Sequence, residues 1–315
     1  MRIVSADEID RLLTFPSLID ALAAAFAVGI RAPARHHHTI ARAGRADATL
    51  LLMPAWTPED AAEPFVGCKM VSVFPDNAQA GRPSLYGTFF LMNGETGEPV
   101  ALMDGRALTA WRTAAASALA ARHLAREDAE HLVMIGAGAL APYLVCAHAS
   151  VRPVKRVTLW NRTRSKAVSL AFGLAVGGVE IEVADDLEDA VRSADIVSCA
   201  TLTSEPLIHG AWLKKGAHVD LVGGFTPTMR EADDRAMKRA RLYVDTRDGA
   251  REAGDIAQPI ENGVIAEEDI KGDLFDLCGG KAKGRTSAAQ ITLFKSVGTA
   301  IEDLAAAMLV WRSLT

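Results

Sequence analysis

The feature that most constrains the fold of this chain is a hydrophobic strand pattern that runs into a glycine turn and then into a helical pattern. The stretch is His131-Leu-Val-Met-Ile-Gly-Ala-Gly-Ala-Leu-Ala141. Gly136 permits a tight turn, Gly138 lets the backbone approach a pyrophosphate, and Ala141 is small enough for the next helix to pack against a sheet. Free N–H groups at the start of that helix favour phosphate binding. The pattern predicts a dinucleotide-binding turn that comprises Gly136, Gly138, Ala139 and Leu140; ordinary turns and methyltransferases share this pattern.

The segment after the next predicted strand bears on which dinucleotide is bound. Arg156–Trp160 follows the glycines by about twenty residues, where an acidic residue would read the ribose of NAD. That acid is missing. The segment instead supplies amide, hydroxyl and cationic donors suited to a 2′-phosphate, from Asn161, Arg162, Thr163, Arg164 and Lys166. The sequence therefore predicts NADP rather than NAD, with a solvated basic turn at a helix start as the alternative.

Between His131 and about Thr246 the chain alternates short apolar runs with helical patterns. This alternation is what a doubly wound parallel sheet requires. The predicted fold class is therefore α/β, with a Rossmann sheet in this part of the chain. The six predicted strands are Val133–Ile135, Val157–Trp160, Glu180–Val183, Ile196–Ala200, His218–Leu221 and Leu242–Val244.

The rest of the chain has a different pattern. Apolar residues recur at helical spacing from about Ser5 to Ile30, from Thr109 to Leu124 and from Thr292 to Leu314, and these stretches predict three helices. Between the first two, prolines and an Asn-Gly turn separate short strand-like runs. Such turns are typical of an antiparallel or mixed sheet. The predicted strands are Thr49–Met53, Phe65–Phe74, Gly87–Met92 and Pro99–Asp104.

Composition restricts the class of protein. The chain has 315 residues, half of them apolar, and a net charge of −5, which suits two domains with cores of their own. We expect no nucleic-acid partner because there is no basic stripe, and no membrane partner because no signal-like or eighteen-residue apolar segment occurs. The expected location is the cytoplasm. His36-His37-His38 is interpreted as a polar strand or loop rather than a metal site, because successive strand residues point to opposite faces.

Two cations stand in otherwise apolar surroundings. Lys69 lies within the strand-like run Gly67–Phe74, and Arg112 lies among small residues near a helix start. A buried ammonium requires either an acid partner or a bound anion. The fork of an arginine can hold a carboxylate by two parallel hydrogen bonds. Both residues are therefore candidates for binding a small acid, and ion pairing with acids of the chain is the alternative.

Several short motifs together resemble one known family, and they cover nearly the whole chain. They are Pro33-Ala-Arg35, Leu52-Met-Pro54, Lys69, Met103-Asp-Gly105 with Thr109-x-x-Arg112-Thr-Ala-Ala115, the glycine turn, Glu252-Ala-Gly-Asp255 and Thr292-Leu-Phe-Lys-Ser-Val-Gly298. The chain resembles the ornithine cyclodeaminase/mu-crystallin family. The resemblance implies a homodimer, a discontinuous α+β substrate-binding and dimerisation domain at residues 1–115 and 291–315, and an NAD(P)-binding Rossmann domain at 116–290.

The resemblance also implies roles for individual residues. Basic residues that match Arg35, Lys69 and Arg112 hold the substrate carboxylate in the family. Glu252 and Asp255 are expected to orient Lys69 or contact the substrate nitrogen, with helix capping or ion pairing as the alternative. Further cofactor contacts are expected from Thr88, Thr201 and Ser296, and also from Arg112 and Gly224.

Departures from the family pattern favour one branch of it. The cyclodeaminase has acids at two positions where this chain has Leu51 and Phe225. The acid at the position of Phe225 is expected to handle protons on the substrate amino group. The loss of both acids therefore argues against ornithine deamination. The run Phe225-Thr-Pro-Thr-Met-Arg-Glu231 resembles the bacterial reductases of cyclic imino acids, and Asn161-Arg162-Thr163 resembles the NADPH-using branch. Phe225 would supply an apolar wall for a compact ring.

The resemblance therefore implies NADPH-dependent reduction of a cyclic ketimine carboxylate. The expected substrate is delta-1-pyrroline-2-carboxylate or delta-1-piperideine-2-carboxylate, and the product is L-proline or L-pipecolate. In that scheme Arg112 and Lys69 are the catalytic residues. Three alternatives stay open: an NAD-dependent ornithine cyclodeaminase, an alanine dehydrogenase, and a non-catalytic NADPH-dependent binding protein like mu-crystallin.

Overall fold

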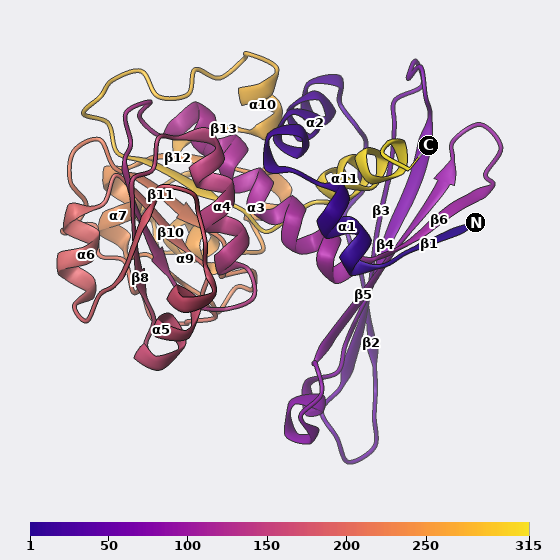
Figure 1. Cartoon of the computed structure of the whole chain (residues 1–315), viewed down its shortest axis with the longest axis horizontal. Helices are drawn as coiled ribbons and strands as arrows, with labels where there is room; N and C mark the ends of the chain where they lie inside the picture. The colour runs from indigo at the N-terminus through magenta and orange to yellow at the C-terminus, as the bar shows by residue number, and fades with distance from the viewer. Residues whose placement is uncertain (315) are drawn as a thin grey trace. The chain divides into compact units, whose positions relative to one another are not determined.

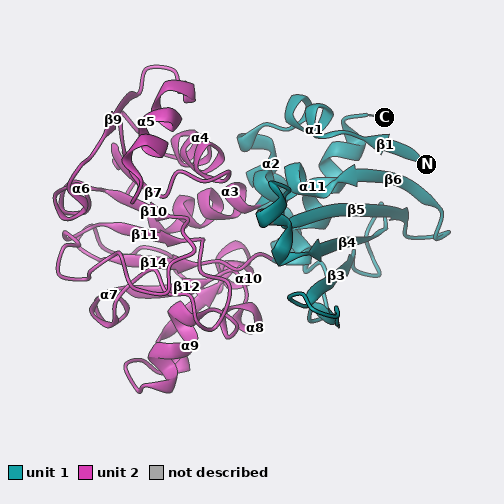
Figure 2. Ribbon diagram, turned by 90° about the horizontal axis from the view of Figure 1, so that it is seen from below, with its two compact units in different colours: residues 1–112, 299–315 teal, residues 113–298 magenta. Residues whose placement is uncertain are grey.

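The computed structural model describes residues 1–314, and the chain divides into two compact units (Figure 2). Unit 1 comprises Met1–Arg112 together with the C-terminal residues from Thr299, and unit 2 comprises Thr113–Gly298. The units thus divide the chain a few residues away from the domain limits expected from the sequence. The main difference concerns residues 291–298, which belong to the sheet of unit 2.

Unit 1 is built on a mixed six-stranded sheet with the order β1-β6-β5-β4-β3-β2. β1 pairs in parallel with β6, and every other neighbouring pair is antiparallel, as the turn chemistry predicts. The histidine run lies on β2, whose five residues are all exposed. The strands are β1 (Arg2–Val4), β2 (His36–Ile40), β3 (Ala48–Trp56), β4 (Phe65–Val73), β5 (Leu85–Asn93) and β6 (Pro99–Asp104).

The first predicted helix is in fact two helices, α1 (Ala6–Leu12) and α2 (Phe15–Val28). The prediction of one helix is wrong because Leu13 and Thr14 are extended and Pro16 lies in the first turn of α2, where its missing N–H costs nothing. α2 packs against α11 (Ala300–Arg312), which also contacts β3 and β4 (Figure 1). Among the described residues no single helix is long and apolar enough to cross a membrane; α1 and α2 pass that test only together, as a pair bent by 90°.

Unit 2 is built on an eight-stranded parallel sheet with the order β13-β12-β14-β11-β10-β7-β8-β9. All six strands predicted from the sequence are present, and the α/β fold class is confirmed. The strands are β7 (His131–Ile135), β8 (Arg156–Trp160), β9 (Glu180–Val183), β10 (Ile196–Cys199), β11 (His218–Leu221), β12 (Arg241–Val244), β13 (Ile270–Asp273) and β14 (Thr292–Lys295).

The prediction of one helix over Thr292–Leu314 is wrong in its first part. β14 is a fully buried strand between β11 and β12, and the helix α11 begins only at Ala300. A strand that is buried on both faces has no alternation of apolar and polar residues, so its four residues matched a helical pattern equally well.

Helices cover both faces of the parallel sheet. On one face Val197 and Leu221 pack in a core that includes Val191 of α6 (Leu187–Ser193) and Met237 of α7 (Asp234–Arg239). On the other face the Oδ2 atom of Asp220 accepts hydrogen bonds from Ser198 and from His148 of α4 (Ala141–Val151). The remaining helices are α3 (Gly105–Leu124), which begins in unit 1, α5 (Arg164–Gly173), α8 (Arg247–Ala250), α9 (Gly254–Glu261) and α10 (Leu274–Cys278).

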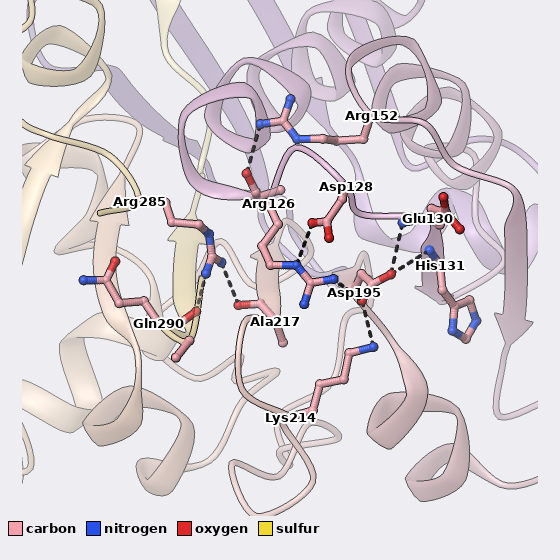
Figure 3. A network of polar contacts seen from close by, with 12 residues as sticks. Arg126, Asp128, Glu130, His131, Arg152, Asp195, Lys214, Ala217, Arg285 and Gln290 are labelled. Carbon is pink, nitrogen blue, oxygen red and sulfur yellow. Dashed lines mark hydrogen bonds and ion pairs between the residues drawn. The ribbon is translucent and has the colours of Figure 1, made fainter. Parts of the chain in front are cut away.

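A polar network ties together the amino ends of the central strands (Figure 3). Asp195, just before β10, accepts hydrogen bonds from the backbone N–H groups of Glu130 and His131 and pairs with Arg126 and Lys214. Ion pairs thus gather at the amino ends of these strands, and the ligand sites of open α/β sheets lie at the opposite, carboxyl ends.

Candidate functional site

The glycine turn between β7 and α4 has the geometry of a phosphate-binding loop. Gly136 has φ 101°, and a Cβ atom there would lie 2.6 Å from the carbonyl oxygen of Ala200. A Cβ atom on Gly138 would meet nothing within 4 Å, so the backbone there faces open space. Ala141 is fully buried at the start of α4. Gly136 and Ala141 therefore each have a steric reason within the chain, whereas Gly138 leaves space beside its backbone, which is what the close approach of a pyrophosphate would need.

The backbone of this turn offers hydrogen-bond donors. The N-cap residue of α4, Leu140, makes no side-chain capping bond. Within the described part of the chain, the N–H groups of Gly138 and Ala139 have no hydrogen-bond acceptor. The N–H of Ala137 donates to Oδ1 of Asn161 at 3.2 Å, which joins the turn to the basic segment after β8. Free N–H groups at a helix start are suited to a pyrophosphate.

A cavity of about 330 Å³ lies at this turn. Its size falls in the range of small-molecule sites. It is at the carboxyl ends of β7, β8 and β10, and β7 and β10 flank the point where the strand order reverses, which is where open α/β sheets bind their ligands. Among the predicted cofactor residues, six line it: Gly136, Gly138, Asn161, Arg162, Lys166 and Thr201. Arg164 instead pairs with Asp185.

The two buried cations of unit 1 lie in one cluster with two acids of α11. Nζ of Lys69 is 2.9 Å from Oδ1 and 2.8 Å from Oδ2 of Asp303, and 3.4 Å from Oγ1 of Thr109. Nη1 of Arg112 is 2.6 Å from Glu302, and its Nε is 3.0 Å from Asp303. The alternative of ion pairing with acids of the chain is therefore realised, and the cluster carries two positive and two negative charges.

Burial changes the acidity of Lys69. The side chain is only 3% exposed, and desolvation, together with the nearby charge of Arg112, lowers its pKa to about 8 although Asp303 opposes the shift. An ammonium with this pKa exchanges its proton near neutral pH. The cluster can therefore supply a proton near neutral pH.

That Asp255 orients Lys69 stays a prediction, while within unit 1 the acid paired with Lys69 is Asp303. Asp255 lies at the start of α9 in unit 2, where its Oδ2 is 3.2 Å from Nζ of the buried Lys295. Its Oδ1 accepts hydrogen bonds from the N–H groups of Glu231 and Ala232. Asp255 thus makes ion pairs, which was the alternative.

The other predicted site residues are spread over both units. In unit 1, Arg35 precedes β2 and Thr88 lies on β5, and both are half-buried. In unit 2, Phe225 is 50% exposed and Glu252 is half-buried before α9. Gly224 donates its N–H to Glu231, and Ser296 is buried directly after β14. Thr163 is the N-cap of α5. Its contact with the cofactor remains a prediction.

The sequence analysis missed the three buried acids that pair with Lys69, Arg112 or Lys295 besides Asp255, namely Glu231, Glu302 and Asp303. A signal was present for the last two, because they stand side by side within the otherwise apolar helix α11. Acids are almost never fully buried without partners, so their position in that helix already required buried cations.

The fold and the turn define a Rossmann-type dinucleotide-binding protein. The chain belongs to the ornithine cyclodeaminase/mu-crystallin family, which it matches over residues 2–315. It is 39% identical over 313 residues to a delta(1)-pyrroline-2-carboxylate reductase of Colwellia psychrerythraea, covering 98% of this chain and 97% of that protein. It is 34% identical to the ketimine reductase mu-crystallin of Rattus norvegicus, covering 98% and 96%.

A solved structure agrees with this placement. The delta(1)-pyrroline-2-carboxylate reductase of Thermococcus litoralis, in complex with NADH and L-proline, superposes with a TM-score of 0.91 at 33% identity, covering 99% of this chain and 97% of that one. The family expected from the sequence motifs is therefore confirmed.

Proposed function

We propose that this protein is an NAD(P)H-dependent oxidoreductase that reduces a cyclic ketimine carboxylate to the corresponding L-imino acid. The substrates we propose are delta-1-pyrroline-2-carboxylate and delta-1-piperideine-2-carboxylate, with L-proline and L-pipecolate as products. The observation that carries the proposal is the buried Lys69, held between Asp303 and Thr109, with a pKa lowered to about 8. The named reductases to which the chain is similar support it.

The reaction requires few groups from the protein. When bound, the reduced nicotinamide supplies a hydride to the imine carbon, and the imine nitrogen gains a proton. A C=N bond accepts hydride readily once its nitrogen is protonated, so the chain must mainly hold the ring and deliver that proton. Lys69 is the proposed donor, because an acid with a pKa near the operating pH transfers its proton most effectively.

We propose that basic side chains of unit 1 bind the substrate carboxylate. In the cluster of unit 1 the charges of Lys69 and Arg112 are matched by those of Glu302 and Asp303. We propose that Arg35, which matches a carboxylate-binding residue of the family, joins Lys69 and Arg112 in binding this carboxylate. Arg112 and Lys69 then contribute directed N–H donors rather than net charge.

We propose that Phe225 makes the site select a cyclic substrate. It follows the paired glycines after β11 and is half exposed. The family resemblance implies that the cyclodeaminase has an acid at this position. An apolar wall favours a compact ring over a chain with a terminal ammonium. We propose that Glu252 contacts the substrate nitrogen.

For the cofactor we propose NADPH in preference to NADH. The cavity of unit 2 contains Arg162 and Lys166, both exposed, and the chain has Asn161 where an acid would bind the ribose of NAD. Cationic donors in that place suit a 2′-phosphate. The remaining proposed contacts are Thr88, Ala139, Leu140, Thr163, Gly224 and Ser296. We also propose a homodimer in the cytoplasm.

The test is a comparison of substrates on the purified protein. The two cyclic imines, pyruvate with ammonia, and ornithine are supplied in parallel with NADPH or NADH, and oxidation of the cofactor is followed by its absorbance. We expect turnover with a cyclic imine and NADPH. Ammonia release from ornithine without added reductant would instead identify a cyclodeaminase, and turnover of pyruvate with ammonia alone an alanine dehydrogenase.

A further inference from the structure

A buried carboxylate that the proposed reaction does not use joins two loops at the cofactor cavity of unit 2. Glu231 is fully buried. Its Oε1 accepts hydrogen bonds from the N–H of Thr201 at 2.8 Å and from Oγ1 of Thr201 at 2.9 Å. Its Oε2 accepts from the N–H of Gly223 at 2.8 Å and of Gly224 at 3.2 Å. One side chain thus holds the loops that follow β10 and β11.

These two loops touch each other and form part of the cavity wall. A Cβ atom on Gly223 would lie 1.9 Å from the carbonyl oxygen of Thr201, so the two backbones are in direct contact. Thr201 lines the cavity, and its methyl group would be 3.1 Å from a Cβ atom on Gly136. A shift of Thr201 would therefore move the wall opposite the phosphate-binding turn.

The carboxylate is itself held in place. The backbone N–H of Glu231 donates to Asp255 at 2.7 Å, and its carbonyl oxygen accepts from Leu207 and Ile208 at 2.9 Å each. Nζ of Lys295 lies 3.7 Å from Oε2 of Glu231 and 3.2 Å from Asp255. The buried ammonium offsets part of the negative charge of the two acids. Four hydrogen-bond donors thus converge on a carboxylate that is held in place.

We propose that Glu231 is a positioning residue for the cofactor, whose carboxylate keeps Thr201 and the Gly223–Gly224 turn in the arrangement that a bound dinucleotide requires. This inference rests on one part of the proposed function, namely that the cavity binds NADPH or NADH. A carboxylate is needed because an amide has one acceptor oxygen, and its NH₂ group would face N–H donors. Glu231→Gln therefore leaves part of the two loops without an acceptor.

The experiment measures the dissociation constant of NADPH by fluorescence titration of the full chain, without imine. Since hydrogen bonds to a charged acceptor are among the stronger ones, we expect Glu231→Gln to raise it about tenfold or more. Thr201→Val removes one of the four donors and should raise it roughly two- to fivefold. At saturating NADPH, the KM for the imine should be unchanged in both variants. A raised dissociation constant for NADPH with an unchanged KM for the imine is a result that a mere loss of folded protein would not give.

The matched control is Glu205→Gln, which removes an exposed carboxylate from the same loop after β10 and should leave the dissociation constant within about twofold. An unchanged constant in folded Glu231→Gln overturns the proposal. If that variant does not fold, Thr201→Val decides, and an unchanged constant there overturns it. Failure of the wild type to bind either nucleotide would overturn the cofactor assignment as well. Normal binding without imine turnover would leave this inference standing and refute only the proposed reaction.

Discussion

Each of the two units buries a cluster of opposite charges, but the charges are balanced in one cluster and not in the other. In unit 1, Lys69 and Arg112 meet Glu302 and Asp303, so two cations face two acids. In unit 2, Lys295 is the cation placed beside both Glu231 and Asp255.

The difference appears in which group has a shifted acidity. In unit 1, desolvation and the neighbouring Arg112 lower the pKa of Lys69 to about 8. In unit 2, desolvation raises the pKa of Glu231, and the charge of Asp255 adds to that effect while Lys295 opposes it. The first cluster holds a cation that can lose a proton near neutral pH, which suits chemistry. The second holds an acid whose oxygens all accept hydrogen bonds from loops, which suits positioning.

Removing the ammonium of Lys69 should give the largest effect on turnover. We expect Lys69→Met to lower kcat/KM for the cyclic imine by about 10²–10⁴-fold, the usual contribution of a positioned proton donor. The dissociation constant of NADPH should not change. Lys155→Met, which removes an exposed lysine of unit 2, is the control. A loss of less than about tenfold for Lys69→Met would contradict a role in proton transfer.

The balance of charges predicts different stability losses in the two clusters. Lys295→Met leaves Glu231 and Asp255 buried without their cation and should lower the free energy of unfolding by about 3–5 kcal/mol. Lys69→Met should cost less, because Nε of Arg112 remains 3.0 Å from Asp303. Urea unfolding of both variants measures the difference, and an equal or larger loss for Lys69→Met would show that the clusters do not differ in this way.

Cofactor choice should depend on the exposed cations after β8. We expect Arg162→Ala to raise the dissociation constant of NADPH about tenfold and to leave that of NADH nearly unchanged, because only NADPH carries the 2′-phosphate. Arg164→Ala, which removes a side chain already paired with Asp185, should have a smaller effect. Equal losses for both nucleotides would show that this segment does not read the phosphate.

The smallest effect we expect is a displaced pH profile. Reduction needs the protonated form of Lys69, so kcat/KM should fall as the pH rises through about 8. The charged groups that face Lys69 are Arg112 from α3 and Glu302 and Asp303 from α11. Asp303→Asn removes a charge that favours the ammonium, so the alkaline limb should move to lower pH by about one unit. Glu302→Gln should move it less, and a limb that stays in place in Asp303→Asn would rule out Lys69 as the titrating group.

The parts of the fold that could be predicted are those with a local signal. The glycine turn, the strands beside it and the basic segment after β8 were all located, because each depends on residues close together in the sequence. The strand β14 was not, since a short strand buried on both faces has no period to distinguish it from a helix. The break between α1 and α2 was also missed, although Pro16 is visible in the sequence.

The sequence by itself determined that this chain has a dinucleotide-binding turn with room for phosphates, and that two cations stand among apolar residues. The sequence shows both features because a glycine inside a helix or strand, or a charge among apolar residues, is costly in any fold. Only the tertiary structure decided which acids meet those cations. Asp303 reaches Lys69 from 234 positions away, and Asp255 meets Lys295 instead, because ion pairs form between residues that packing brings within a few ångströms and no local pattern records that distance.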